Sequence, residues 1–166
     1  ALADVDGDTD PDVLLNGWNG QERIAKLYLN DGNLGFVEVQ NLPFPGLTES
    51  DMATVDVNGD EAVDVFLCGW NGAERVSTLY LNDGDGNFSV VLNAPFVGVV
   101  RGAVAHADVD SDGDPDLMIA GEESASIFPP GAVEIAKLYL NDGTGAFSEV
   151  SGSPFAGVSY CSLGFA

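Results

Sequence analysis

The nine residues DVDGDTDPD, Asp4 to Asp12, return as DVNGDEAVD from Asp56 to Asp64 and as DVDSDGDPD from Asp108 to Asp116. The interval is 52 residues both times. Each copy has an oxygen-bearing side chain at its first, third, fifth and ninth positions, namely Asp4, Asp6, Asp8, Asp12, Asp56, Asn58, Asp60, Asp64, Asp108, Asp110, Asp112 and Asp116. Alternate residues of a tight loop can direct their oxygens at one centre, where Ca²⁺ takes about six to eight oxygen ligands. The spacing therefore predicts one Ca²⁺ site in each loop, and up to three in the chain.

The alternative is that these three acidic loops are only solvated turns, because Asp, Asn and Gly are common in turns. Two observations favour the metal. Four or five acidic groups within nine residues repel one another unless a cation or hydrogen bonds compensate, and a plain turn requires no fixed spacing of oxygens. The second loop is the weakest candidate, because Asn58 is neutral and Ala62 stands where the other loops have Asp10 and Asp114.

The composition is that of a folded acidic protein. The 166 residues carry a formal net charge of −22, yet 45% are hydrophobic, enough for one domain with a sizeable core or part of a larger one. Only five residues are Lys or Arg, so we expect no nucleic-acid partner. The sequence contains no run of 18 apolar residues, so it predicts no membrane span. Cys68 and Cys161 lack metal-type spacing; we interpret Cys68 as a small strand residue, with a disulfide as the alternative.

Each acidic loop is followed by the same succession of strand signals. An apolar run ending in Gly, at 13–17, 65–69 and 117–121, predicts a short, largely buried strand. Leu-Tyr-Leu-Asn-Asp-Gly then occurs at 27–32, 79–84 and 138–143, which predicts a second strand and a tight turn, because Asn, Asp and Gly tolerate positive φ. A Phe at the same offset in each copy, Phe36, Phe88 or Phe147, opens the returning strand.

A Pro-Phe pair at 43–44, 95–96 and 154–155 marks the crossing to the next unit, where the Phe can serve as an anchor. A small-residue strand, such as 103–107, then leads into the next acidic loop. Each unit is therefore four short antiparallel strands with calcium between the first and the second. Units of this size predict an all-β protein built of three β-propeller blades.

Two features differ between the repeats. The third repeat has 59 residues, and its seven extra residues fall within 122–134, where a binding surface or a neutral surface insertion is expected. Trp18 and Trp70 occupy the same place in the first two repeats. They can serve as a sugar-stacking platform near calcium or as packing anchors between blades.

The repeated pattern Ala-Asp-Val-Asp-Gly-Asp-x-Asp-Pro-Asp, with Leu-Tyr-Leu-Asn-Asp-Gly-x-x-x-Phe after it, resembles the VCBS and FG-GAP repeats of integrin alpha-subunit-like β-propellers. The resemblance covers essentially the whole chain. It implies Ca²⁺ bound by the first, third, fifth and ninth loop positions and by the backbone carbonyl of the seventh, which is Asp10, Ala62 or Asp114. It also implies an extracellular or cell-surface module for adhesion, ligand binding or assembly, in agreement with the millimolar calcium found outside cells. Propellers of the family typically have about six to eight blades.

The repeats divide the chain at about 4–55, 56–107 and 108–166. In this frame, residues 159–166 are the first strand of a further blade, and the first blade lacks its own first strand. An exposed blade edge recruits partners. The tail of one copy can therefore complete the first blade of the next copy, giving a ring or a filament; the alternative is that these repeats are an excerpt from a longer propeller.

We expect no enzymatic activity. The sequence shows no Gly-rich phosphate loop, no Ser-His-Asp order and no Zn-type Cys/His spacing. Calcium ligands of this kind tie loops together and need not leave a position open for substrate. The sequence favours a non-catalytic calcium-binding module for protein assembly or adhesion. The alternative is a carbohydrate-binding propeller that uses Trp18 and Trp70.

Overall fold

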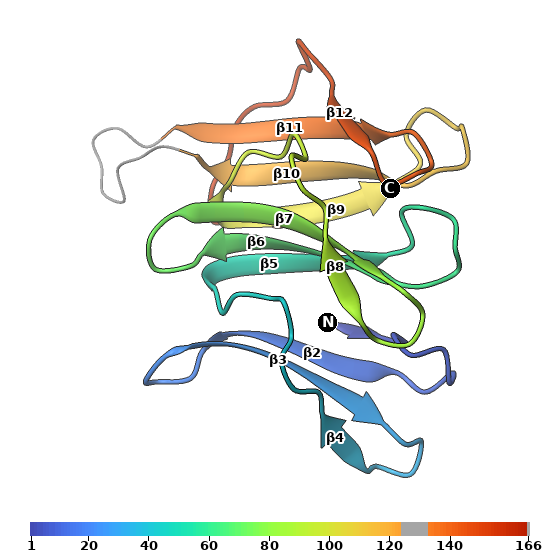
Figure 1. Ribbon diagram of the computed structural model, residues 1–166. Helices are drawn as coiled ribbons and strands as arrows, with labels where there is room; N and C mark the ends of the chain where they lie inside the picture. The colour runs from blue at the N-terminus through green and yellow to red at the C-terminus, as the bar shows by residue number, and fades with distance from the viewer. Residues whose placement is uncertain (124–132, 166) are drawn as a thin grey trace.

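The computed structural model describes residues 1–123 and 133–165, which form three separate four-stranded antiparallel sheets. The predicted all-β class is confirmed, and the sheets have the form of propeller blades (Figure 1). The first sheet contains β1 (Leu2–Ala3), β2 (Asp12–Trp18), β3 (Arg23–Asn30) and β4 (Phe36–Glu38), so the expectation that the first blade lacks its own first strand is wrong, although β1 has only two residues. The second contains β5 (Thr48–Val55), β6 (Asp64–Trp70), β7 (Arg75–Asn82) and β8 (Phe88–Val90). The third contains β9 (Val100–Ala107), β10 (Asp116–Glu122), β11 (Glu134–Asn141) and β12 (Phe147–Glu149).

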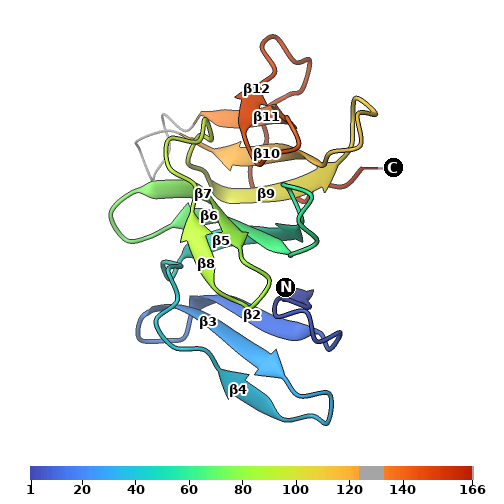
Figure 2. The ribbon, with the colours of Figure 1, turned by 45° about the vertical axis from the view of Figure 1, so that its right-hand side comes forward.

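Within each sheet the strands lie side by side in sequence order, so neighbouring strands are consecutive in the chain. The three sheets follow one another in space as they do in the chain, from β1–β4 at the bottom of Figure 1 to β9–β12 at the top. The view turned by 45° shows the same succession (Figure 2). The acidic loops connect the first strand of each sheet to the second, and they all lie at the same end of the sheets. No helix in the described residues is long and apolar enough to cross a membrane.

The core consists of two layers, one on each side of the middle sheet. Side chains of a strand alternate between its faces, and both faces of β6 are covered. Val65 and Leu67 pack against the first sheet, whereas Phe66 and Cys68 pack against the third. The apolar run at 65–69 therefore forms a strand that is buried on both faces. The interpretation of Cys68 as a small strand residue is confirmed. Both cysteines are free.

The Phe of the first two Pro-Phe crossings anchors one sheet on the next, as predicted. The ring of Phe44 lies 4.8 Å from those of Tyr80 and Phe88, measured between centroids. The ring of Phe96 makes the same pair of contacts one repeat later, 5.1 Å from Tyr139 and 5.2 Å from Phe147. Edge-to-face and tilted pairs at these distances are favourable beyond the apolar area that they bury.

A hydrogen bond that joins neighbouring sheets is also repeated. The side-chain amide of Asn82 donates to the backbone oxygen of Val5 at 2.8 Å, and that of Asn141 donates to the oxygen of Val57 at 2.7 Å. Each Asn belongs to an Asn-Asp-Gly turn, and each Val is the second residue of the acidic loop in the preceding sheet. The turn of one blade thus holds the loop of its neighbour.

A buried ion cluster further joins the second and third sheets. The carboxylate of Glu122 accepts hydrogen bonds from Arg75 at 3.2 Å and from Arg101 at 2.9 Å. Arg101 also reaches Glu49 on β5, at 3.1 Å. Charges buried to this degree are stable only when they are paired, so the cluster fixes the relative position of the two sheets.

The segment 159–165 differs from the sequence prediction, because it does not form a strand. The first strand of a blade pairs with the second strand of that blade, as β9 does with β10, and among the described residues no strand pairs with this segment. Ala166, the last residue of the predicted strand, lies outside the described residues. So does the insertion expected within 122–134, over 124–132.

Replacing Phe96 with Ala should lower the free energy of unfolding by about 3–5 kcal/mol, because the change opens a cavity between two sheets. Urea titration followed by circular dichroism measures the effect. Leu92→Ala, at an exposed position nearby in the chain, is the control and should change stability by less than about 0.5 kcal/mol. Equal unfolding midpoints for the two variants would contradict the anchoring role of Phe96.

Candidate metal centre

The three acidic loops share one backbone conformation. In each of them the fourth and sixth residues have positive φ, and only one of the two is Gly: Gly7 and Thr9, Gly59 and Glu61, Ser111 and Gly113. Positive φ is unfavourable for residues other than Gly, and such strain is stored where a site requires it. The two reversals curl the loop so that alternate side chains lie on its inner side.

Carboxylates inside the loop hold this curl. The first-position Asp4 accepts hydrogen bonds from the backbone amides of Gly7 at 2.8 Å and Thr9 at 2.9 Å. The fifth-position Asp8 accepts one from the amide of Asp10, at 2.9 Å. The second loop repeats the scheme from Asp56 and Asp60. The third loop does so from Asp108 and Asp112, except that Asp108 accepts from the amide of the fifth residue in place of the fourth. The backbone amides therefore compensate part of the loop's negative charge.

The ninth-position aspartates are buried and bond two different segments. The carboxylate of Asp64 accepts a hydrogen bond from the backbone amide of Val57, in its own loop, at 2.9 Å. It accepts a second one from the backbone amide of Asn82, in the following hairpin, at 2.8 Å. Asp12 and Asp116 do the same in their sheets. The sequence marked these residues only as metal ligands, whereas the structure shows that each also ties its loop to the following hairpin.

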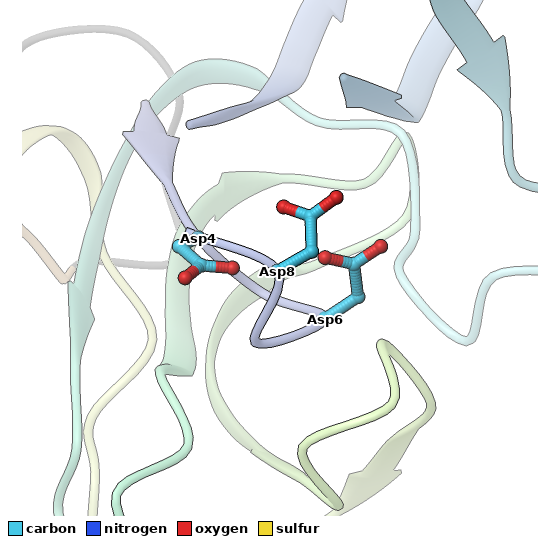
Figure 3. Close-up of side chains that lie close together, drawn as sticks. All are labelled: Asp4, Asp6 and Asp8. Atoms are coloured by element: carbon cyan, nitrogen blue, oxygen red, sulfur yellow. The ribbon is translucent and has the colours of Figure 1, made fainter. Parts of the chain in front are cut away.

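The third-position carboxylate provides the strongest sign of a cation site. Oδ1 of Asp6 is buried and has no hydrogen-bond partner. Carboxylate oxygens of Asp4, Asp6 and Asp8 lie within 4.8 Å of one another, and Figure 3 shows the three side chains gathered along one curl of the loop. A buried, unpaired carboxylate oxygen is costly unless a positive charge is near. The residues of this loop therefore fit a bound Ca²⁺.

The third loop gathers Asp108, Asp110 and Asp116 in the same way, again within 4.8 Å. Among the described residues the second loop forms no such cluster of three carboxylates. Its Asn58 instead donates a side-chain hydrogen bond to Asp60 at 2.9 Å. An amide N–H directed at a ligand carboxylate occupies an oxygen that a cation would use, which is consistent with the prediction that the second loop binds most weakly.

The seventh position lies against the Asn-Asp-Gly turn. A methyl group on Gly32 would overlap the carboxylate of Asp10, and one on Gly143 would overlap that of Asp114. The turn therefore requires Gly for its positive φ, and in the first and third repeats the seventh-position carboxylate lies directly against that Gly. Sequence reasoning assigned the seventh residues, Ala62 among them, only a carbonyl ligand. It missed the contact with the turn, although Asn-Asp-Gly recurs in all three repeats.

Several carboxyl groups of the acidic loops have raised pKa values, so the folded loops disfavour their fully ionised form. Burial, followed by the charges of Asp12 and Asp8, raises the pKa of Asp6. Desolvation, followed by the charge of Asp112, raises the pKa of Asp110 and of Asp114. Burial raises the pKa of Asp64 to about 6, although two backbone amides oppose the rise. A nearby cation would reverse each of these shifts.

Trp18 and Trp70 lie away from the loops. Strands β2 and β6 begin at the ninth-position Asp and end at the Trp, so about 20 Å of strand separates the two ends. The predicted proximity of these Trp residues to calcium is therefore wrong. Each ring instead stacks on an Arg of the next strand, Trp18 on Arg23 at 5.8 Å and Trp70 on Arg75 at 6.0 Å.

Comparison with known protein families gives one match, to the FG-GAP-like repeat. It occurs twice, over residues 4–67 and 56–119, and together the matches span more than half of the chain. The matched segments begin at the first residue of the first and second acidic loops, and the second match includes the third loop. Neither a curated protein nor a solved structure matches the chain.

The metal-free protein should become more stable as the pH is lowered from about 7.5 to 5. The folded pKa of Asp64, about 6, lies above the ordinary value of 3.8, so the folded state binds this proton more tightly than the unfolded state. Stability is gained as the pH falls through 6 and lost as it rises. Urea unfolding in excess chelator measures the slope.

Asp64→Asn removes the titrating group and should flatten that slope, whatever it does to absolute stability. A metal-free protein that loses stability over this pH range, or a variant with the slope of the parent, would contradict the assignment.

Proposed function

Because the chain belongs to the FG-GAP-like repeat family, we propose that it is a calcium-binding β-propeller repeat module that acts in protein assembly or adhesion. The observation that carries the proposal is the buried, unpartnered Oδ1 of Asp6 beside the carboxylates of Asp4 and Asp8. FG-GAP repeats often bind calcium, and the loops hold the acidic oxygens in the arrangement that a hard cation uses.

In this proposal the cation has a structural role. It neutralises carboxylates that burial and mutual repulsion disfavour in their charged form. It thereby stabilises the loops whose second residues, Val5 and Val57, accept the hydrogen bonds from Asn82 and Asn141 of the neighbouring sheets. Calcium in one blade therefore supports the contact with the next blade, and the module is non-catalytic.

The proposed location is extracellular or at the cell surface. FG-GAP repeats are typical of extracellular proteins, and weak calcium sites are filled where calcium is millimolar. The net charge of −22 agrees with this setting, because divalent cations there offset part of it.

Calcium should bind to the protein and raise its unfolding temperature relative to chelator, more strongly than magnesium does, because the loops supply many flexible oxygen ligands. Asp110→Asn removes one carboxylate of the third-loop cluster and should weaken that site by at least about tenfold. Isothermal titration calorimetry and thermal unfolding measure both effects.

Glu74→Gln also removes one negative charge, from the exposed turn between β6 and β7 at the end of the strands away from the acidic loops, and is the matched control, with calcium affinity unchanged. Asn58→Asp replaces the amide that bonds Asp60 with a carboxylate, so the second loop should gain affinity. No binding heat and no stabilisation by calcium would overturn the proposal.

A further inference from the structure

The two interfaces between sheets use the same contacts one repeat apart. The leading side of each interface presents a loop Val, two strand residues, the crossing Phe and an aliphatic residue three positions after it. In the first interface these are Val5, Leu14, Leu27, Phe44 and Leu47, and in the second Val57, Phe66, Leu79, Phe96 and Val99. The receiving side presents Val65, Leu67, Tyr80 and Phe88 in the first interface, and Leu117, Ile119, Tyr139 and Phe147 in the second.

The outer side of the first sheet carries the receiving set, and no other described segment covers it. By the repeat register it consists of Val13, Leu15, Tyr28 and Phe36, here called the receiving face. Leu15 is 47% exposed, whereas its equivalents Leu67 and Ile119 are 1% and 0% exposed. Phe36 is 48% exposed, and the hairpin residue Leu34 extends the apolar surface beside it.

The outer side of the third sheet carries the leading set, which is likewise not covered by any segment within 1–123 or 133–165. It consists of Val109, Met118, Leu138, Phe155 and Val158, here called the leading face. Phe155 is 43% exposed, whereas its equivalent Phe44 is buried. Val158 is likewise exposed, although its equivalents Leu47 and Val99 are completely buried.

The tail that presents Phe155 and Val158 already lies in its repeat position. A methyl group on Gly157 would overlap the backbone of Glu134, as one on Gly46 would overlap that of Arg23. Further along, the amide of Tyr160 donates to the oxygen of Arg101, and the Arg101 guanidinium lies 5.4 Å from the Tyr160 ring. The leading face is therefore preorganised, which reduces the entropy lost when a partner binds.

The polar groups of the two faces match as well. Asn30 is the equivalent of Asn82 and Asn141, and the partner of its side-chain amide among the described residues is in its own sheet, the oxygen of Pro11 at 3.1 Å. Val109 is the equivalent of Val5 and Val57, which accept the hydrogen bonds between sheets. A donor on the receiving face thus corresponds to an acceptor on the leading face.

The edge of β2 supplies a third element of complementarity. Strand β1 covers β2 only at Asp12 and Val13, with Ala1 bonding Leu14, so no described strand pairs with residues 15–18 on that side. In the second sheet β5 covers the equivalent positions, with Thr48 opposite Trp70 and Met52 opposite Leu67. The same register places Ser159 of a tail opposite Trp18, and Leu163 opposite Leu15.

We propose that the leading face and tail of one copy of this chain bind the receiving face and β2 edge of a second copy. The inference names a partner for the module proposed above, and its contacts lie outside the acidic loop carboxylates. The interface is heterologous, because two different faces meet in it. In a pair of chains all four faces are covered only when the leading face of each chain binds the receiving face of the other. Two copies of three sheets give six blades, a number within the range of closed β-propellers.

The test measures the mass of the full chain in calcium by light scattering and sedimentation equilibrium, which should give twice the 17.2 kDa of the monomer. Phe36→Asp and Phe155→Asp each place a charge on one exposed face and should weaken pairing by about 30-fold or more, as expected for a residue central to an interface. Leu92→Asp makes the same kind of change at an exposed position outside both faces and should have no effect.

An equimolar mixture of Phe36→Asp and Phe155→Asp tests whether the receiving face of one chain binds the leading face of the other. One intact junction, Phe36 of one variant with Phe155 of the other, remains available, so the mixture should dimerise although neither variant does alone. A parent chain that stays monomeric well above micromolar concentration, or a mixture without rescue, would overturn the proposal.

Calcium affinity, measured on the same samples, separates this proposal from the preceding one. A chain that binds calcium and remains monomeric refutes only the pairing, whereas a chain that pairs but ignores calcium refutes only the calcium-binding role.

Discussion

The blades depend on three buried carboxylates, those of Asp12, Asp64 and Asp116. Each accepts one backbone amide from its loop and one from the following hairpin, in an environment with almost no solvent. Removing such a carboxylate would leave two backbone amides without their acceptor, and each buried unpaired donor costs about 1–3 kcal/mol. The acidic character of the ninth position is therefore a requirement of the fold before it is a feature of any metal site.

Loop, hairpin and neighbouring sheet form one connected set of hydrogen bonds. In the third sheet, Asn141 donates its backbone amide to Asp116 and its side-chain amide to Pro115 and to Val57 of the second loop. The position of the second loop thus fixes a turn in the next sheet, and the apolar contacts of Phe96 follow from that placement. A cation bound in a loop would act on this whole network, which connects the metal chemistry to the packing of the blades.

Much of this organisation could be predicted, because it depends on local sequence patterns that recur. The apolar runs, the Asn-Asp-Gly turns and the Pro-Phe crossings all lie where strand periodicity and turn chemistry put them. The hydrogen bonds between blades could not be predicted, because they join residues 77 and 84 positions apart through one side-chain amide. The Trp residues show a second limit: proximity in sequence to an acidic loop suggested proximity in space, yet an extended strand carries Trp18 and Trp70 to the opposite end of the sheet.

The outermost strand of every sheet is only three residues long: β4, β8 and β12. A free strand edge is a template for amyloid-like pairing with other chains, and very short edge strands are one way in which proteins prevent it. Here the short edges occur on a chain of net charge −22, whose copies repel one another in the absence of counterions. The protein is therefore protected against lateral aggregation along its outer rim, even though its sequence is rich in strands.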